Sequence, residues 1–212
     1  MTSTIASTIA STSIQYISLG SNCALTYQLN KLGLRTNSYP FDWYKISLWQ
    51  LVCVLTNIFN DFSESVKFKK FSLVHNLFDI PSNKILDLDS AIFTNKYNIQ
   101  FAHEFTVNYE LENFKQKFKQ RIERFCSVLT NSKTNIFVRI ETSSIKSNWE
   151  KQIGKIKLGK SNWEKQINIL VGLLSGYSKN FKLILIVCEC SDKEFVFGPN
   201  IHVIKFDTFS PD

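Results

Sequence analysis

A cysteine stands at the point where a β-rich run gives way to a helical pattern. The run stops at Gly20, and the next two residues, Ser21 and Asn22, are types that commonly cap helix N-termini. Cys23 is therefore expected in the first turn of a helix that continues to Leu32. Free backbone N–H groups and the helix dipole favour a thiolate there, which is the nucleophilic form of cysteine. The alternative is a cysteine that only packs, because free cysteines are commonly buried.

His103, in the segment NIQFAHEF, is the best candidate for a general base, because imidazole titrates near neutral pH. His75 and His202 lie in less distinctive settings. If the segment is a strand, the neighbouring Glu104 points away from His103, since consecutive side chains alternate. Asp42, in PFDW, or a backbone carbonyl could orient the ring instead. A histidine with a purely structural role is the alternative.

Arg139 places a charge inside the apolar run NIFVRI. Such a charge is expected at a strand end or in a pair with a carboxylate. One interpretation is a structural ion pair. The other is that Arg139 binds a carboxylate or phosphate group of a substrate at the carboxyl end of the sheet, where open α/β folds bind ligands.

The cysteine pattern argues against metal binding and against disulfides. The five cysteines are odd in number and most lie in apolar runs, which favours free thiols in a reducing compartment. They are Cys23, Cys53, Cys126, Cys188 and Cys190. No Cys/His cluster has zinc spacing, and no GxGxxG or Walker-type loop occurs. We expect neither a metal nor another cofactor.

The charge of +7 comes from 25 Lys and Arg that are scattered among 18 acidic residues. This pattern favours a solvated basic surface over a specific nucleic-acid site. No apolar stretch approaches the roughly 20 residues that span a bilayer, and the first 13 residues lack the features of a secretory signal. We therefore predict a protein of the cytoplasm that does not bind membranes.

Hydrophobic periodicity predicts one α/β domain over residues 14–212, after a disordered low-complexity tail over residues 1–13. The sheet should be mixed or largely parallel and covered by helices. Helices are expected over Cys23–Leu32, Leu48–Phe59, Glu110–Leu129 and Trp163–Tyr177. Strands are expected over Ile14–Leu19, Asn135–Ile140, Phe181–Cys188 and Ile201–Phe206. Residues 66–74 and 84–93 could be short strands or loops.

The octapeptide KSNWEKQI occurs twice, at residues 146–153 and 160–167, which indicates a tandem duplication. The second copy runs into the apolar NILVGLL and belongs to the last predicted helix. The first copy is followed by Gly154 and Gly159, so residues 146–159 are expected to form a surface insertion.

These segments together resemble a known family. ISLGSNCALTYQLNKLGLRTNSYPFDW resembles the opening signature of the papain-like cysteine peptidases, an uncharacterised family with an SLG-x-x-C element, a helix, a Leu-Arg turn and a PFDW element. NIQFAHEF resembles its His-Asp-Phe element, RIERF its Arg-rich helix and NIFVRIE its central strand. The resemblance extends from about Ile14 to Cys190 and is strongest in the first third.

The resemblance implies that Cys23 is the nucleophile and His103 the base, in the Cys-before-His order of papain-like folds. Two positions depart from the pattern. Glu104 stands where the family has Asp. The glutamine that completes the oxyanion hole of papain-type enzymes has no clear counterpart, which leaves Asn22 or the Cys23 backbone N–H as donors.

We therefore expect a cysteine-dependent hydrolase or acyltransferase that acts on an amide, ester or thioester of an unidentified protein or small molecule. An alternative is a non-catalytic interaction module, for example of a large DNA virus with an AT-rich genome, whose protein would act in the host cytoplasm. A third reading is a domain that binds a phosphorylated ligand through Arg139.

Overall fold

A computed structural model describes residues 14–21, 23–73, 89–101, 111–141, 160–188 and 197–206. The predicted tail and the predicted insertion lie outside these ranges. The elements in chain order are β1 (Ile14–Ser18), α1 (Cys23–Lys31), α2 (Leu48–Thr56), β2 (Lys67–Leu73), β3 (Asp89–Thr94), β4 (Gln100–Phe101), α3 (Leu111–Thr130), β5 (Thr134–Glu141), α5 (Lys160–Tyr177), β6 (Phe181–Cys188) and β7 (Ile201–Phe206).

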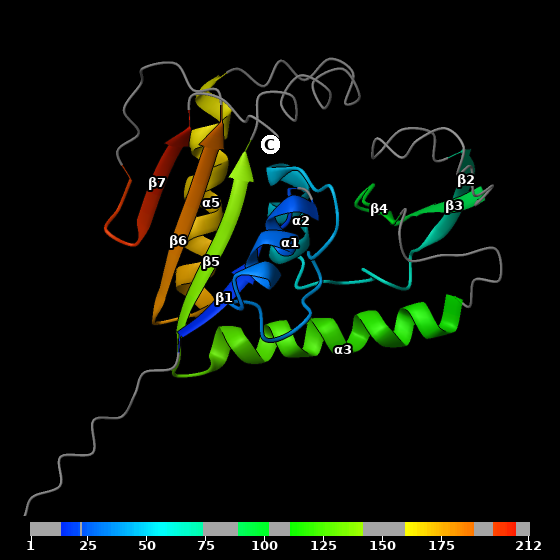
Figure 1. The fold of residues 1–212 in the computed structure, drawn as a ribbon, viewed down its shortest axis with the longest axis horizontal. Helices are drawn as coiled ribbons and strands as arrows, with labels where there is room; N and C mark the ends of the chain where they lie inside the picture. The colour runs from blue at the N-terminus through cyan, green and yellow to red at the C-terminus, as the bar shows by residue number, and fades with distance from the viewer. Residues whose placement is uncertain are drawn as a thin grey trace, which may run out of the picture.

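The larger sheet has four strands in the order β1-β5-β6-β7, and every neighbouring pair is parallel. Its inner strands, β5 and β6, are rich in apolar residues, and β5 is buried along almost its whole length, as expected for a strand that is covered on both faces. Helices lie between β1 and β5 and between β5 and β6 along the chain (Figure 1). The α/β fold with a mixed or largely parallel sheet is thereby confirmed.

Alternate side chains of the strands enter two separate apolar clusters, because successive side chains point to opposite faces of a sheet. On one face, Phe137 and Leu183 join the main core with α2, α3 and α5. On the other face, Ile136 and Val138 pack with Leu25 of α1. Figure 1 shows α1 and α5 on opposite sides of this sheet.

A smaller antiparallel sheet, β2-β3-β4, extends the molecule along α3 (Figure 1). The two parts share an aromatic core in which Phe118 of α3 stacks on Phe62 and meets Phe101 of β4 edge-on, with ring centroids 5.7 and 5.4 Å apart. Gln50 of α2 also binds this part, since its side-chain amide donates to the carbonyls of Tyr97 and Asn98. The helical spacing of apolar residues over 110–129 therefore correctly predicted the face of α3 that packs into this core.

Several predicted boundaries shift. Ser47 caps α2 through a complete capping box, but the helix ends at Thr56 rather than at Phe59, where the backbone has turned to φ +56°. The last helix begins at Lys160 rather than Trp163. None of the helices in the described ranges combines the length and apolar character that a bilayer crossing requires.

Gly20 and Gly33 both have positive φ, +77° and +67°, but only Gly20 lies against other atoms. A Cβ at Gly20 would lie 2.2 Å from Cγ2 of Ile46, whereas a Cβ at Gly33 meets nothing within 4 Å. Gly33 closes α1, as predicted. The contact at Gly20 holds the loop before Cys23 against the segment that leads into α2.

We expect Gly20→Ala to lower the free energy of unfolding by about 3 kcal/mol, because overpacking adds to the cost of a left-handed backbone. Gly33→Ala adds only the backbone cost, about 1 kcal/mol. Urea unfolding of both variants measures the difference. Equal losses would show that the close approach at Gly20 carries no energy of its own.

Candidate active site

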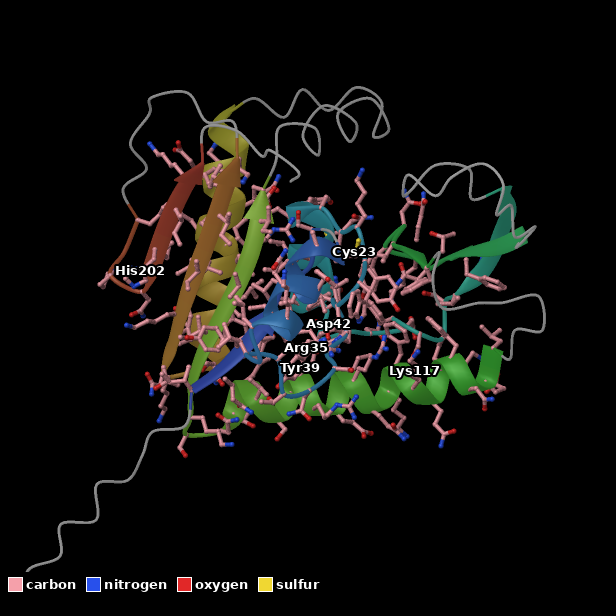
Figure 2. All side chains as sticks on the ribbon, viewed as in Figure 1. Cys23, Arg35, Tyr39, Asp42, Lys117 and His202 are labelled. Atoms are coloured by element: carbon pink, nitrogen blue, oxygen red, sulfur yellow. The ribbon has the colours of Figure 1, made fainter. Side chains whose placement is uncertain are left out.

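Cys23 lies at the carboxyl end of the parallel sheet. Beyond β1, the Leu19 N–H still donates to the carbonyl of Val138 in β5, at 2.9 Å, and the chain then turns at Gly20. Cys23 is the first residue of α1, and its thiol is free and partly exposed. Figure 2 shows this side chain at the start of the helix. The predicted placement of Cys23 in the first turn of a helix is therefore correct.

Ser21 does not cap α1. Its hydroxyl is buried and makes no hydrogen bond within the described part of the chain. Its backbone takes a φ of +97° instead of the extended geometry of an N-cap, so of the two predicted cap candidates only Asn22, which lies outside the described residues, is left.

Arg139 is wholly buried and forms an ion pair with Glu141, two residues further along β5. Its other two nitrogens donate to the carbonyls of Leu19 and Ile46, at 2.9 and 3.0 Å. Arg139 therefore forms the structural ion pair that was the first of the two interpretations of this residue. A role for Arg139 in substrate binding stays a prediction, and all three nitrogens of its guanidinium already donate to groups within the chain.

Asp42 is also buried, with 1% of its surface exposed. Oδ2 accepts from Nε and Nη2 of Arg35, at 3.1 and 2.9 Å, and from the Tyr39 N–H at 2.9 Å. The Thr26 hydroxyl of α1 lies 3.5 Å from Oδ1. Figure 2 shows Arg35, Tyr39 and Asp42 together, below Cys23 in that view. Asp42 therefore clamps the loop between α1 and α2, and its role in orienting His103 stays a prediction.

The loop over residues 35–46 is held from its other side by α3. Nε of Arg124 donates to the carbonyl of Ser38 at 3.1 Å. Arg121 donates to the Tyr44 hydroxyl at 3.3 Å and lies over the Phe118 ring. Both arginines belong to the RIERF segment, so this part of α3 holds the loop between α1 and α2.

Two of the predicted site residues, Asn22 and His103, lie outside the described residues, as does Glu104. The described strand that precedes His103 in sequence is β4, which ends at Phe101. The Phe101 ring packs against Tyr44, with centroids 5.1 Å apart, and so connects β4 to the loop that carries Asp42.

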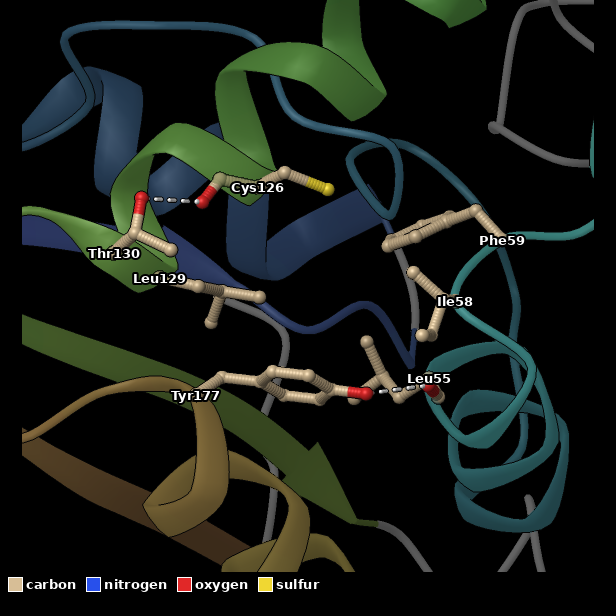
Figure 3. A pocket seen from close by; sticks show the side chains of 7 residues that line it. All are labelled: Leu55, Ile58, Phe59, Cys126, Leu129, Thr130 and Tyr177. Carbon is tan, nitrogen blue, oxygen red and sulfur yellow. Dashed lines mark hydrogen bonds between the residues drawn. The ribbon is translucent and has the colours of Figure 1, made fainter.

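The other two cysteines with described side chains, Cys53 and Cys126, are also free and partly exposed. Burial raises the pKa of both Cys53 and Cys126 above the ordinary thiol value. Cys126 borders an apolar cavity of about 180 Å³ (Figure 3). The cavity is lined by Leu55, Ile58, Phe59, Cys126, Leu129, Thr130 and Tyr177. The described side chains hold no group of three or more His, Cys, Asp or Glu that could bind a metal.

Sequence reasoning missed the partners that hold this site. Glu141 follows Arg139 at i+2 and therefore shares its face of the strand, a spacing that could have revealed the pair. The pairing of Arg35 with Asp42 gave no such signal, since it depends on the path of an irregular loop.

The chain belongs to a family of α/β proteins with a papain-like signature. The model of the family described as "Putative papain-like cysteine peptidase" matches residues 14–171. An uncharacterized protein of Acanthamoeba polyphaga mimivirus is 31% identical over 196 residues, which cover 85% of this chain and 80% of the viral protein. No solved structure matches significantly.

We predict a pH-dependent loss of stability in Arg35→Ala. Burial already raises the pKa of Asp42, and removing Arg35 takes away a group that lowers it. The loss should be about 3 kcal/mol at pH 7, because a buried carboxylate loses its partner. It should shrink as pH falls through the raised pKa toward the ordinary value of 3.8, since protonation removes the buried charge.

Lys96→Ala is the matched control. Lys96 also pairs with an aspartate, Asp61, and lies over an aromatic ring, but this pair is exposed. Its removal should not change the unfolding midpoint measurably. If the two variants behave alike between pH 5 and 7, the buried clamp does not stabilise the fold.

Proposed function

We propose that the protein is a cysteine-dependent hydrolase or acyltransferase in which Cys23 is the nucleophile and His103 the general base. The observation that carries the proposal is the setting of Cys23, a partly exposed thiol on the first residue of a helix at the carboxyl end of a parallel sheet. Family membership supports the same assignment.

In the proposed reaction, the thiolate of Cys23 bonds to the carbonyl carbon of an amide, ester or thioester. The carbonyl electron pair moves to oxygen, and its return expels the leaving group, to which the His103 imidazolium gives a proton. Water or another acceptor then bonds to the carbonyl carbon of the resulting thioester and gives its proton to His103. The carbon–sulfur bond breaks as this intermediate collapses, which releases the acid or acylated acceptor and restores the Cys23 thiolate. The backbone N–H of Cys23 and the positive end of the α1 dipole stabilise the negative charge near Cys23.

The geometry around Cys23 supports this role because the flanking segments are fixed. Gly20 packs on Ile46, and Arg139 binds the carbonyls on both sides of that contact. A nucleophile is most effective when its surroundings do not have to reorganise during the reaction.

The substrate class is an acyl compound, either a protein or a small molecule, and no cofactor or metal takes part. The mimivirus relative favours a viral protein that acts in the host cytoplasm. The second candidate, a non-catalytic interaction module, keeps the same fold, and it differs from the enzyme in having no unusually reactive thiol at Cys23.

We predict that iodoacetamide at pH 6 alkylates Cys23 well before the other four cysteines, because an unperturbed thiol of pKa about 8.5 is almost wholly protonated there. His103→Ala should slow this reaction roughly tenfold, since the imidazolium stabilises the thiolate. Mass spectrometry of the digested protein assigns each site.

His202→Ala is the control, because His202 is an exposed residue of β7 and should not affect Cys23. Alkylation of Cys23 at the rate of the other thiols, or an equal effect of the two histidine variants, would favour the interaction module.

A further inference from the structure

The apolar cavity beside Cys126 lies where three helices end. Leu55 belongs to the last turn of α2, Thr130 is the last residue of α3, and Tyr177 is the last residue of α5. The C-terminus of a helix carries about half a negative charge, because its last carbonyl groups have no partner within the helix. Three such partial charges therefore meet at one cavity.

These three helix ends carry no compensating cation of their own. The last turns of α2, α3 and α5 contain no Lys, Arg or His. The next lysines after α3 and α5, Lys133 and Lys179, are exposed and do not line the cavity. The charge that complements the edge of this cavity is therefore positive.

The interior of the cavity, in contrast, suits an apolar group. Its walls include the rings of Phe59 and Tyr177, and Figure 3 shows the Cys126 sulfur pointing toward Phe59. The lining hydroxyls of Tyr177 and Thr130 already donate to backbone carbonyls, at 3.5 and 3.3 Å. The volume of about 180 Å³ has room for one benzene ring, since a cavity of about 150 Å³ already binds benzene.

Ile58, which also lines the cavity, stands where glycine is usual. The chain after α2 forms a Schellman motif, in which the Ile58 N–H donates to the Leu55 carbonyl. The Phe59 N–H donates to the Val54 carbonyl. The position of Ile58 in this motif needs a left-handed backbone, and its φ is +48°, which is unfavourable for a β-branched residue. The side chain is 66% exposed, so burial in the fold does not offset this cost.

We propose that this cavity binds an organic cation in which an aromatic or short alkyl group carries an ammonium head. The apolar group lies between Phe59 and Tyr177, whose rings also attract cations. The head stays at the side where Ile58 and Thr130 are exposed, so that it keeps contact with water near the three helix ends. The described lining shares no residue with the site proposed at Cys23, so this site does not depend on the proposed function.

Benzyltrimethylammonium is the probe, because its charge does not depend on pH. At about ten times its dissociation constant, the probe should slow the alkylation of Cys126 by iodoacetamide roughly tenfold, since nearly all sites are then occupied. Cys53 is the internal control. Its thiol is also free and partly exposed, and burial raises its pKa as well, but it does not line the cavity. Mass spectrometry follows both cysteines in one sample.

Two analogues of the probe test the role of charge. Benzyl alcohol should bind roughly tenfold more weakly than benzyltrimethylammonium, and benzoate more weakly still, because each helix end changes the affinity for a charge a few-fold. Equal protection of Cys126 by all three compounds would mean an unselective apolar cavity and would overturn the proposal. A probe that protects Cys126 no more than Cys53 would overturn it too.

Ile58→Gly tests whether this side chain covers the ligand. The affinity for the probe should fall at least about threefold, since apolar contact is lost. The thermal midpoint should stay equal or rise, because glycine relieves the left-handed strain. Leu32→Gly is the matched control, since Leu32 is 67% exposed directly after α1 and does not line the cavity. An equal affinity for the probe in the two variants would overturn the proposed position of the ligand.

Discussion

The buried guanidinium of Arg139 is the constraint on which the rest of the site depends. A charge in the interior is tolerated only when it is paired and its donors are satisfied. Glu141 supplies the opposite charge, and the carbonyls of Leu19 and Ile46 accept the remaining hydrogen bonds. The Leu19 carbonyl lies directly after β1, and the Ile46 carbonyl lies just before α2. Three segments that are distant in sequence must therefore meet at the carboxyl end of β5.

A second set of polar contacts fixes the loop between α1 and α2. Asp42 binds Arg35, the Tyr39 N–H and the Thr26 hydroxyl, while Arg124 reaches the same loop from α3. The aromatic core under α3 then connects this loop to β4 through Tyr44 and Phe101. Most residues of the family signature thus fix the segments around Cys23 through their contacts. Cys23 itself carries the partly exposed thiol.

The sequence predicted the elements whose patterns are local. The apolar runs of β5 and β6 and the helical spacing of α3 set the fold class, and the turn at Gly20 placed Cys23 at the start of α1. The short strand β4 carried no readable pattern. The partners of Asp42 and Arg139 could not be predicted either, because they depend on how loops far apart in sequence meet. Ser21 and Asn22 are both residue types that cap helices, and only the fold shows that the Ser21 hydroxyl is unpaired.

We propose that this support brings the Cys23 thiol and the His103 imidazole together for acyl transfer. The most direct measurement is the distance from Sγ of Cys23 to the nearer ring nitrogen of His103 in a crystal structure. A dyad predicts about 4 Å or less, with allowance for loose geometry in the absence of substrate. A separation beyond about 8 Å, with both side chains ordered and no movable segment between them, would contradict the account.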